Sequence, residues 1–458
     1  MDSARQPPDR YLPMTFSKEP LIVSPDDHPI RHHMIDRDAM HVLRVLRDNG
    51  YAGYLVGGGV RDLYLGKTPK DFDISTDARP GQIRKLFRNS RTIGRRFRLV
   101  QILFRGKEIE LSTLRSLSEY DLDGPETVLA PNNTYGSLDE DAQRRDLTIN
   151  SLFYEIENNT IIDYVGGIDD LDHSVIRIVG DPERRITRDP VRMLRAIRHA
   201  ARLNFKIAPR TWQAICSHHE KLPLCPPSRI RDEFIKDLHS GAFAAWLDLA
   251  LESELFFDIL GLYKKTLFKK EQAEELPYRE QLTALAKVID RRALLAKESE
   301  QQGLPNDFLL AFLLIPWANA RFDLVRQNLK GAAAFRFSKI IRDQLDTELG
   351  TQLNLRRSTR QEMVILLSNL PQFLRHLEND TWPKWMKKKS YFKTCSLFCD
   401  LYLESVTGIL TDTHLPSVQK QPPQTDMDSS HSRNRGGQKK RYRPAFTTKK
   451  KGIFGLKK

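Results

Sequence analysis

The spacing of hydrophobic residues changes near residue 180 and divides the chain into two kinds of structure. Before that point, apolar and polar residues alternate over short stretches, which is the pattern of half-buried strands. The stretches that predict strands are 51–56, 70–75, 97–104 and 108–114. Beyond residue 180, apolar residues recur at helical spacing nearly to Thr411 and the alternation disappears. We therefore expect an α+β protein, in which a mixed sheet with its helices is followed by an all-α region.

The predicted helices are bounded by residues that favour helix ends. From Ala39 to Leu46, apolar residues recur at i, i+3, i+4 and i+7, which predicts an amphipathic helix over 36–49. Further helices are expected over 60–65, 79–87 and 190–205. In the last of these, Asp189 is predicted to be the N-cap and Pro190 the first helical residue.

Composition refines this division into five expected segments. They are an N-terminal arm over 1–36, an α/β head over 37–180, a helical neck over 181–270, a helical body over 271–414 and a disordered tail over 415–458. The net charge of +14 is concentrated in the tail, where twelve Lys and Arg residues stand against two Asp residues. Such a basic tail favours a polyanionic partner, because neutralised phosphates release their counterions.

The cellular setting follows from what the chain lacks. Four cysteines in 458 residues do not make a disulfide framework, and buried free thiols are the expected reading. The first residues contain no apolar signal region, and no run of about 18 apolar residues occurs. These features predict a soluble, cytoplasmic protein with no membrane association.

Two aspartates carry the strongest chemical signal. Asp71 and Asp73 stand two positions apart on a predicted strand, so their side chains share one face while Phe72 and Ile74 point into a core. Mg²⁺ prefers one or two carboxylates together with substrate oxygens and water. We expect this pair to hold two Mg²⁺ ions for nucleotidyl transfer. A third carboxylate would come from Glu110 or from Asp146, and the sequence leaves both open.

A glycine-rich segment precedes the aspartates. In GGGVRD, the consecutive Gly57, Gly58 and Gly59 would let the backbone approach phosphate oxygens, and Arg61 would offer its guanidinium to the same oxygens. A plain tight turn is the alternative interpretation. The sequence fits neither the dinucleotide-binding motif nor the P-loop motif.

Together these residues resemble the class II tRNA nucleotidyltransferase/poly(A) polymerase family of the DNA polymerase beta superfamily. The matching stretches extend over about 38–240 in the family's order. They are LVGGGVRDLYLGKTPKDFDIST, RNSRTIGRRFRLVQILF, EDAQRRDLTINSLFY, DYVGGIDDL and RDPVRMLRAIRHAARL. A later stretch, PPSRIRDEFIKDLHSG, resembles the neck motif of the family.

The resemblance implies a role for each matching residue. Asp71 and Asp73 would be metal ligands, with Asp146 as the third catalytic acidic residue. The residues that would bind the nucleotide are Gly57, Gly58, Arg61, Arg145, Asn150, Asp189 and Arg192, and the neck motif adds Arg229 and Glu233. Among them, Asp189 and Arg192 would read the edge of the base. Arg188 stands where the family usually has Glu.

The implied activity is template-independent addition of AMP from ATP to RNA 3′ ends, in mRNA polyadenylation and decay. The head would carry the chemistry, the neck would recognise the base, and the body and tail would bind RNA. GRRFRL and the basic tail resemble the poly(A) polymerase branch of the family. A CCA-adding enzyme acting on tRNA is the first alternative, and a non-catalytic RNA-binding protein is the second.

Overall fold

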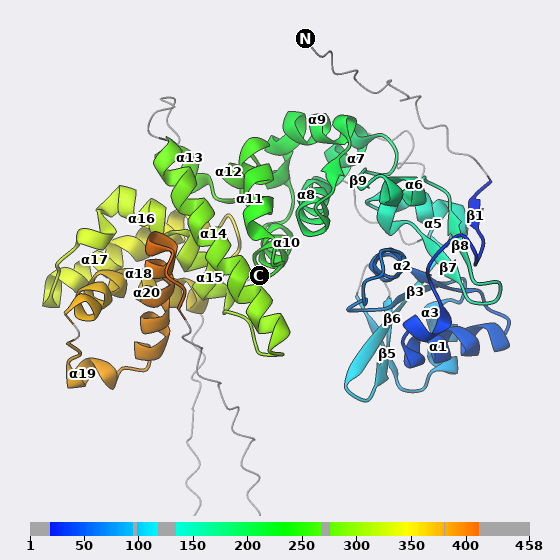
Figure 1. Ribbon diagram of the computed structural model, residues 1–458, viewed down its shortest axis with the longest axis horizontal. Coiled ribbons are helices and arrows are strands. Elements are labelled where there is room, and N and C mark those ends of the chain that lie inside the picture. The colour runs from blue at the N-terminus through cyan, green and yellow to red at the C-terminus, as the bar shows by residue number, and fades with distance from the viewer. Residues whose placement is uncertain (1–18, 95–98, 118–133, 267–274, 380, 412–458) are drawn as a thin grey trace, which may run out of the picture. The chain divides into compact units, whose positions relative to one another are not determined.

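The computed structural model in Figure 1 describes residues 19–94, 99–117, 134–266, 275–379 and 381–411. Its main sheet has eight strands in the order β1-β8-β7-β2-β3-β6-β5-β4. Only the pairing of β3 with β6 is parallel within this sheet, so the sheet is mixed. The strands are β1 (Leu21–Val23), β2 (Gly53–Val56), β3 (Asp73–Thr76), β4 (Ser90–Ile93), β5 (Leu99–Phe104), β6 (Lys107–Thr113), β7 (Phe153–Glu155) and β8 (Thr160–Asp163).

Short helices flank this sheet. They are α1 (Arg37–Asp48), α2 (Gly58–Tyr64), α3 (Pro80–Leu86), α5 (Leu138–Arg144), the 3₁₀ helix η2 (Thr148–Asn150) and α6 (Gly167–Asp172). Leu55 and Ile74 are fully buried and join α1 in the main core. Val56 and Phe153 point the other way and pack with Ala142 of α5 in a smaller cluster. The two faces of the sheet are therefore buried to different extents. The face that carries Val56 and Phe153 retains room for polar side chains.

From residue 175 to residue 411, the described residues are almost entirely helical. The two short strands β9 (Val175–Ile176) and β10 (Lys206–Ile207) pair in parallel. The helices are α7 (Pro182–Arg188), α8 (Val191–Leu203), α9 (Pro209–His218), α10 (Pro227–Leu238), α11 (Phe243–Glu252), α12 (Leu255–Ile259), α13 (Gly261–Thr266), α14 (Glu275–Glu298), α15 (Asn306–Leu313), α16 (Ile315–Phe322), α17 (Gly331–Leu345), α18 (Arg357–Glu378), α19 (Lys384–Lys387) and α20 (Phe392–Thr407). The predicted α+β architecture is confirmed.

Local signals that bound a helix were predicted well. Asp36 caps α1, because its side chain accepts hydrogen bonds from the amides of Asp38 and Ala39. Gly106 turns the chain between β5 and β6 with a φ of 87°, a conformation that favours glycine. Pro80 begins α3, as the pattern indicated.

Other predictions need correction. Part of the expected N-terminal arm belongs to the sheet, since Leu21–Val23 pairs with β8. Strand β4 was missed, because its residues are polar and exposed. Asp189 is not the N-cap of α8: it follows the last residue of α7, and Pro190 occupies the cap position. The arginines of GRRFRL and the segment 415–458, which was expected to form the tail, lie outside the described residues.

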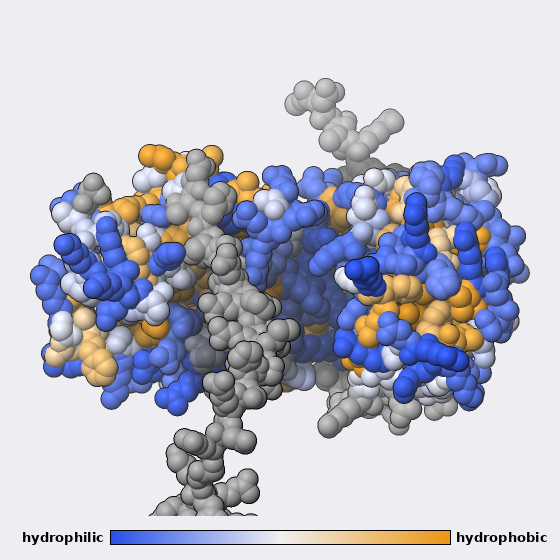
Figure 2. All heavy atoms as spheres, turned by 90° about the horizontal axis from the view of Figure 1, so that it is seen from below, coloured by the Kyte–Doolittle hydropathy of each residue, from blue (hydrophilic) through white to orange (hydrophobic). Residues whose placement is uncertain are grey.

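On the face drawn in Figure 2, hydrophilic residues dominate and hydrophobic residues gather in separate patches. Among the described residues, none of the helices combines the length and the apolar character that crossing a bilayer requires. Three of the four cysteines are buried and the fourth, Cys216, is half-buried; none forms a disulfide.

Gly167 is expected to be intolerant of a side chain. A Cβ there would lie 2.3 Å from the backbone oxygen of Thr148 in η2. This oxygen cannot move without a shift of the η2 backbone, which leads into β7. We expect Gly167→Ala to lower the free energy of unfolding by about 1–3 kcal/mol, measured by urea denaturation. Gly81→Ala in α3 is the matched control, because a Cβ there meets no atom within 4 Å. Equal stability of the two variants would contradict this packing.

Candidate active site

The pairing of β3 with β6 brings acidic side chains together. In this parallel register Asp73 lies opposite Glu110, and Ser75 lies opposite Ser112. Asp71 stands two residues before Asp73, just outside the strand, and is exposed. Glu110 thus lies beside Asp73, as the alternation of β6 predicted. These carboxylates occupy the less covered face of the sheet, because Ile74 and Leu111 point into the core behind it.

Asp71, Asp73 and Glu110 form an acidic group whose like charges repel one another. Surrounding protein atoms desolvate Asp73 although part of its side chain stays exposed, and this desolvation raises its pKa. The charges of Glu110 and Asp71 raise it further, while Arg145 opposes them, and the pKa of Asp73 reaches about 6. Protein cations therefore compensate the negative charge only in part. Such a site favours additional positive charge from outside the chain.

Gly57 brings the glycine-rich segment up to these carboxylates. Its φ of 68° and ψ of −138° are accessible almost only to glycine. A Cβ at this position would lie 3.7 Å from Nη1 of Arg145 and 3.9 Å from Oδ2 of Asp73. The predicted loop of three glycines is shorter than expected, because α2 already begins at Gly58.

Arg145 is held firmly beside the acidic group. Its guanidinium donates to Asp141 at 2.9 and 3.1 Å and to the hydroxyl of Ser75 at 3.2 Å. It also lies over the ring of Phe153, 5.0 Å from the centroid. Asp141 was not predicted as part of the site. The four-residue spacing from Asp141 to Arg145 could have revealed it, since such pairs meet on a helix.

Arg61 and Asn150 meet, but inside the protein. Arg61 is 4% exposed and donates 2.7 Å to Oδ1 of Asn150. The same guanidinium donates to Asp62 and lies 3.3 Å from the ring of His199. The guanidinium of Arg61, which the sequence predicted to contact phosphate, is thus bound here by side chains of the chain itself. Arg61 links α2 with η2 and α8.

Asp146 accepts hydrogen bonds from helix α8 and from the backbone. Its Oδ2 accepts from Arg195 at 3.1 Å, and its Oδ1 accepts from the amide of Leu147 at 2.8 Å. Burial alone would raise the pKa of Asp146, but Arg195, then Arg192 and His199, hold it well below its ordinary value. Asp146 is therefore a fixed anion facing helix α8.

Arg195 extends this anion into a buried network. It also donates to Glu233 of α10 at 3.2 Å, and Arg198 donates to the other oxygen of Glu233 at 2.6 Å. Arg198 additionally bonds Asp237. Burial favours protonation of Glu233, yet Arg195 and Arg198 lower its pKa to about 2. The network joins α8 to α10 and both to Asp146. Arg195 and Arg198 follow Arg192 at intervals of three, a spacing that could have indicated one helical face.

A second ion pair fixes the residues expected to read the base. Arg229 of α10 makes two contacts with the carboxylate of Asp189, at 2.8 and 2.9 Å. Arg192 lies 3.9 Å from the same carboxylate and donates to the carbonyls of Arg145, at 2.6 Å, and Arg144, at 3.0 Å. Asp189, Arg192 and Arg229 thus form one cluster, while Glu233 belongs to the neighbouring network.

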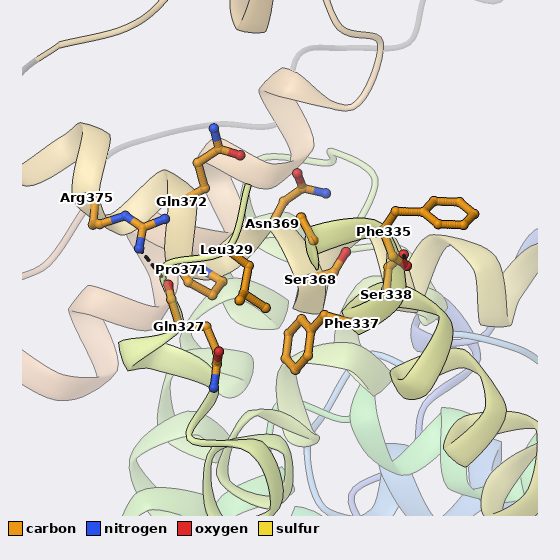
Figure 3. Close-up of a pocket in the computed structure, with 11 residues that line it drawn as sticks. Gln327, Leu329, Phe335, Phe337, Ser338, Ser368, Asn369, Pro371, Gln372 and Arg375 are labelled. Carbon is orange, nitrogen blue, oxygen red and sulfur yellow. Dashed lines mark hydrogen bonds between the residues drawn. The ribbon is translucent and has the colours of Figure 1, made fainter. Parts of the chain in front are cut away.

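The carboxylates alone do not complete a metal centre. Among the described residues, no group of three or more His, Cys, Asp and Glu side chains is arranged to hold an ion. Asp71 and Asp73 lie near the glycines at 57–59, whose backbone a phosphate could approach. Such a pair nevertheless suits Mg²⁺, which takes its other ligands from substrate and water. A cavity of about 200 Å³ between α17 and α18, shown in Figure 3, contains none of the predicted site residues.

Comparison with known proteins agrees with this arrangement. Residues 53–177 match the Poly A polymerase head domain, and residues 204–260 match the probable RNA- and SrmB-binding site of polymerase A. Poly(A) polymerase I of Salmonella typhi is 48% identical over 227 residues, which are 48% of this chain and 49% of that protein. Over these stretches the chain is similar to poly(A) polymerases. The resemblance drawn from the sequence motifs is confirmed.

The chain is also similar to CCA-adding enzymes. The one from Lactobacillus helveticus is 41% identical over 222 residues, 47% of this chain and 54% of that enzyme. The crystal structure of Bacillus stearothermophilus CCA-adding enzyme in complex with CTP has a TM-score of 0.57 and 23% identity, covering 82% of this chain and 78% of that one. At this identity the likeness shows a shared fold. The chain spans about half the length of the curated relatives it matches.

The network around Glu233 gives a prediction in pH. The pKa of Glu233 falls from 4.5 to about 2 on folding. The ionised carboxylate therefore stabilises the folded protein fully above about pH 4.5, and this stabilisation is lost as the pH falls toward 2. We expect Glu233→Gln to be about 3 kcal/mol less stable than the parent at pH 7, with the difference shrinking below pH 4.5. Urea denaturation across pH 3–7 measures this.

Asp232→Asn is the control, because its side chain is exposed and pairs only at the surface with Arg231. A Glu233→Gln protein as stable at pH 7 as Asp232→Asn would show that the network contributes little.

Proposed function

We propose that this chain is a template-independent polynucleotide adenylyltransferase, which transfers AMP from ATP to RNA 3′ hydroxyls and releases pyrophosphate. The observation that carries the proposal is the gathering of Asp71, Asp73 and Glu110 on the open face of the sheet, beside Gly57 and Arg145. The 48% identity to poly(A) polymerase I of Salmonella typhi and the match of residues 53–177 to the Poly A polymerase head domain support it.

Asp71 and Asp73 would hold Mg²⁺. The raised pKa of Asp73 fits this role, because a bound cation would relieve the repulsion among the neighbouring carboxylates. When bound, two such ions neutralise the triphosphate and lower the pKa of the attacking 3′ hydroxyl. ATP is the substrate we propose, and ATP and CTP complexes of CCA-adding enzymes share the fold.

The chain's own groups would bind and orient the nucleotide. Gly57, which has no side chain, leaves room for phosphate oxygens near Asp73. Arg145 brings positive charge to the same place, in an orientation fixed by Asp141 and Ser75. At the base, the Asp189 carboxylate is an acceptor held by Arg229, and Arg192 is a donor held by two carbonyls. A wrong base would leave such groups without partners, which is how polar sites discriminate.

RNA 3′ ends, of mRNA or small RNA, are the proposed partners. The match of residues 204–260 to a probable RNA-binding domain supports RNA as the acceptor. The basic tail over 415–458 would add affinity for the RNA backbone without sequence preference. Processing of mRNA by polyadenylation is the role we propose for the activity.

A CCA-adding enzyme is the second candidate. It is favoured by the 41% identity to the Lactobacillus helveticus enzyme, which extends over 222 residues, a share of the chain similar to that matched by poly(A) polymerase I. Both activities would use the same aspartates, so the metal site does not separate them. A non-catalytic RNA-binding protein is disfavoured, because Asp71, Asp73 and Glu110 form a strained acidic group that a binding role does not need.

Removal of one aspartate tests the catalytic assignment. We expect Asp71→Ala to reduce incorporation of labelled AMP into RNA by at least a thousandfold, while its urea denaturation curve stays close to that of the parent. Asp71 is exposed and its side chain makes no hydrogen bond with the described residues, so its loss leaves the fold intact. Asp48→Asn, at an exposed ion pair on α1, is the control. Retained incorporation by Asp71→Ala would refute the assignment.

Nucleotide choice separates the two candidate activities. The purified protein is incubated with ATP or CTP, and with either tRNA lacking its CCA end or an unrelated RNA. We expect long A tracts on both RNAs and little use of CTP. Addition that requires tRNA, uses CTP and stops once CCA is complete would establish the CCA-adding function instead.

A further inference from the structure

An exposed tryptophan on α19 has no structural explanation. Trp385 is 54% exposed, although an indole gains most when it is buried. Its neighbour Met386 is 1% exposed and anchors the same short helix in the core. Trp382, just before α19, packs edge-on against the rings of Phe373 and Phe392, with centroids 5.3 and 5.1 Å apart. The segment is thus fixed in place, and Trp385 is held out toward solvent.

Positive charge surrounds this indole. The exposed lysines of the segment are Lys384, Lys387, Lys388, Lys389 and Lys393. None of them forms an ion pair with the described residues, in contrast to the arginines of the active site. Clustered like charges repel one another, and a polyanion would relieve that repulsion. We call Trp385 and these five lysines the α19 surface.

We propose that the α19 surface binds single-stranded RNA, with a base stacked on Trp385 and phosphates on the lysines. An aromatic ring amid cations is the common arrangement for single strands, since every base has a π face and every linkage an anion. Duplex RNA fits poorly, because its bases are already stacked. An apolar partner surface would not require the lysines. The nature of the ligand rests on the proposed function, which supplies an RNA substrate.

The α19 surface is separate from the features that indicate RNA elsewhere in the chain. It lies beyond residues 204–260, which match the probable RNA-binding domain, and before the basic tail. A strand held at α19 would be retained between successive additions at its 3′ end. The surface therefore would raise the affinity for RNA and leave the acidic group at Asp73 unchanged.

Fluorescence anisotropy with a labelled single-stranded oligoadenylate tests the proposal in the full-length protein. We expect Trp385→Ala to weaken binding about tenfold, and Trp385→Phe, which keeps a stacking ring, to recover most of the affinity. Binding of a blunt RNA duplex should be the same for Trp385→Ala and the parent. The assay contains no ATP, so absence of the proposed transferase activity would not alter its outcome.

A charge variant provides the second measurement. Replacing Lys387, Lys388 and Lys389 by Gln should reduce the slope of log Kobs against log salt by about 2, since each phosphate contact on a single strand contributes about 0.7. The control replaces Arg84, Lys85 and Arg88, on and just after α3, by Gln; they carry the same charge and are also exposed. Unchanged single-strand affinity of Trp385→Ala, or equal slopes for the two triple variants, would overturn the proposal. Either result would point to an acidic protein as the partner of this surface.

Discussion

The parallel pairing of β3 with β6 is the constraint on which the site depends. Because side chains alternate along a strand, burying Ile74 and Leu111 in the core forces Asp73 and Glu110 onto the opposite face, side by side. The free energy of burying the apolar residues thus holds two like charges together that would separate in a flexible loop. Core packing on one face of the sheet is what maintains the repulsion on the other.

Arginines of α8 connect the segment around Arg145 and Asp146 with helix α10. Arg192, Arg195 and Arg198 follow one another at intervals of three. They contact, respectively, the carbonyls at the end of α5, the carboxylate of Asp146, and α10. Because guanidinium groups offer several fixed donors, each can join two elements at once. The segment that carries Arg145 is in this way tied to helix α10, from which Arg229 reaches Asp189.

Much of this could be predicted from the sequence, where the signal is local. The bounds of α1, the hairpin at Gly106 and the shared face of Asp73 and Glu110 follow from caps, turns and alternation, which need only neighbouring residues. Partners distant in sequence could not be predicted. Arg61 was expected to face phosphate, but Asn150, 89 residues away, accepts its hydrogen bond. Asp146 was expected near the metal ligands, but its pairing with Arg195 depends on how α8 packs. Strand β4 was missed because an exposed edge strand has no apolar alternation.

The edges of the main sheet have a consequence for the protein at high concentration. Its outermost strands, β1 and β4, contain only three and four residues. A second chain that docked there would gain few main-chain hydrogen bonds, and at β4 it would meet the cationic side chain of Arg91. Short, charged borders of this kind are a poor template for strand-by-strand growth, so the sheet is protected against fibril-like self-association by its own geometry.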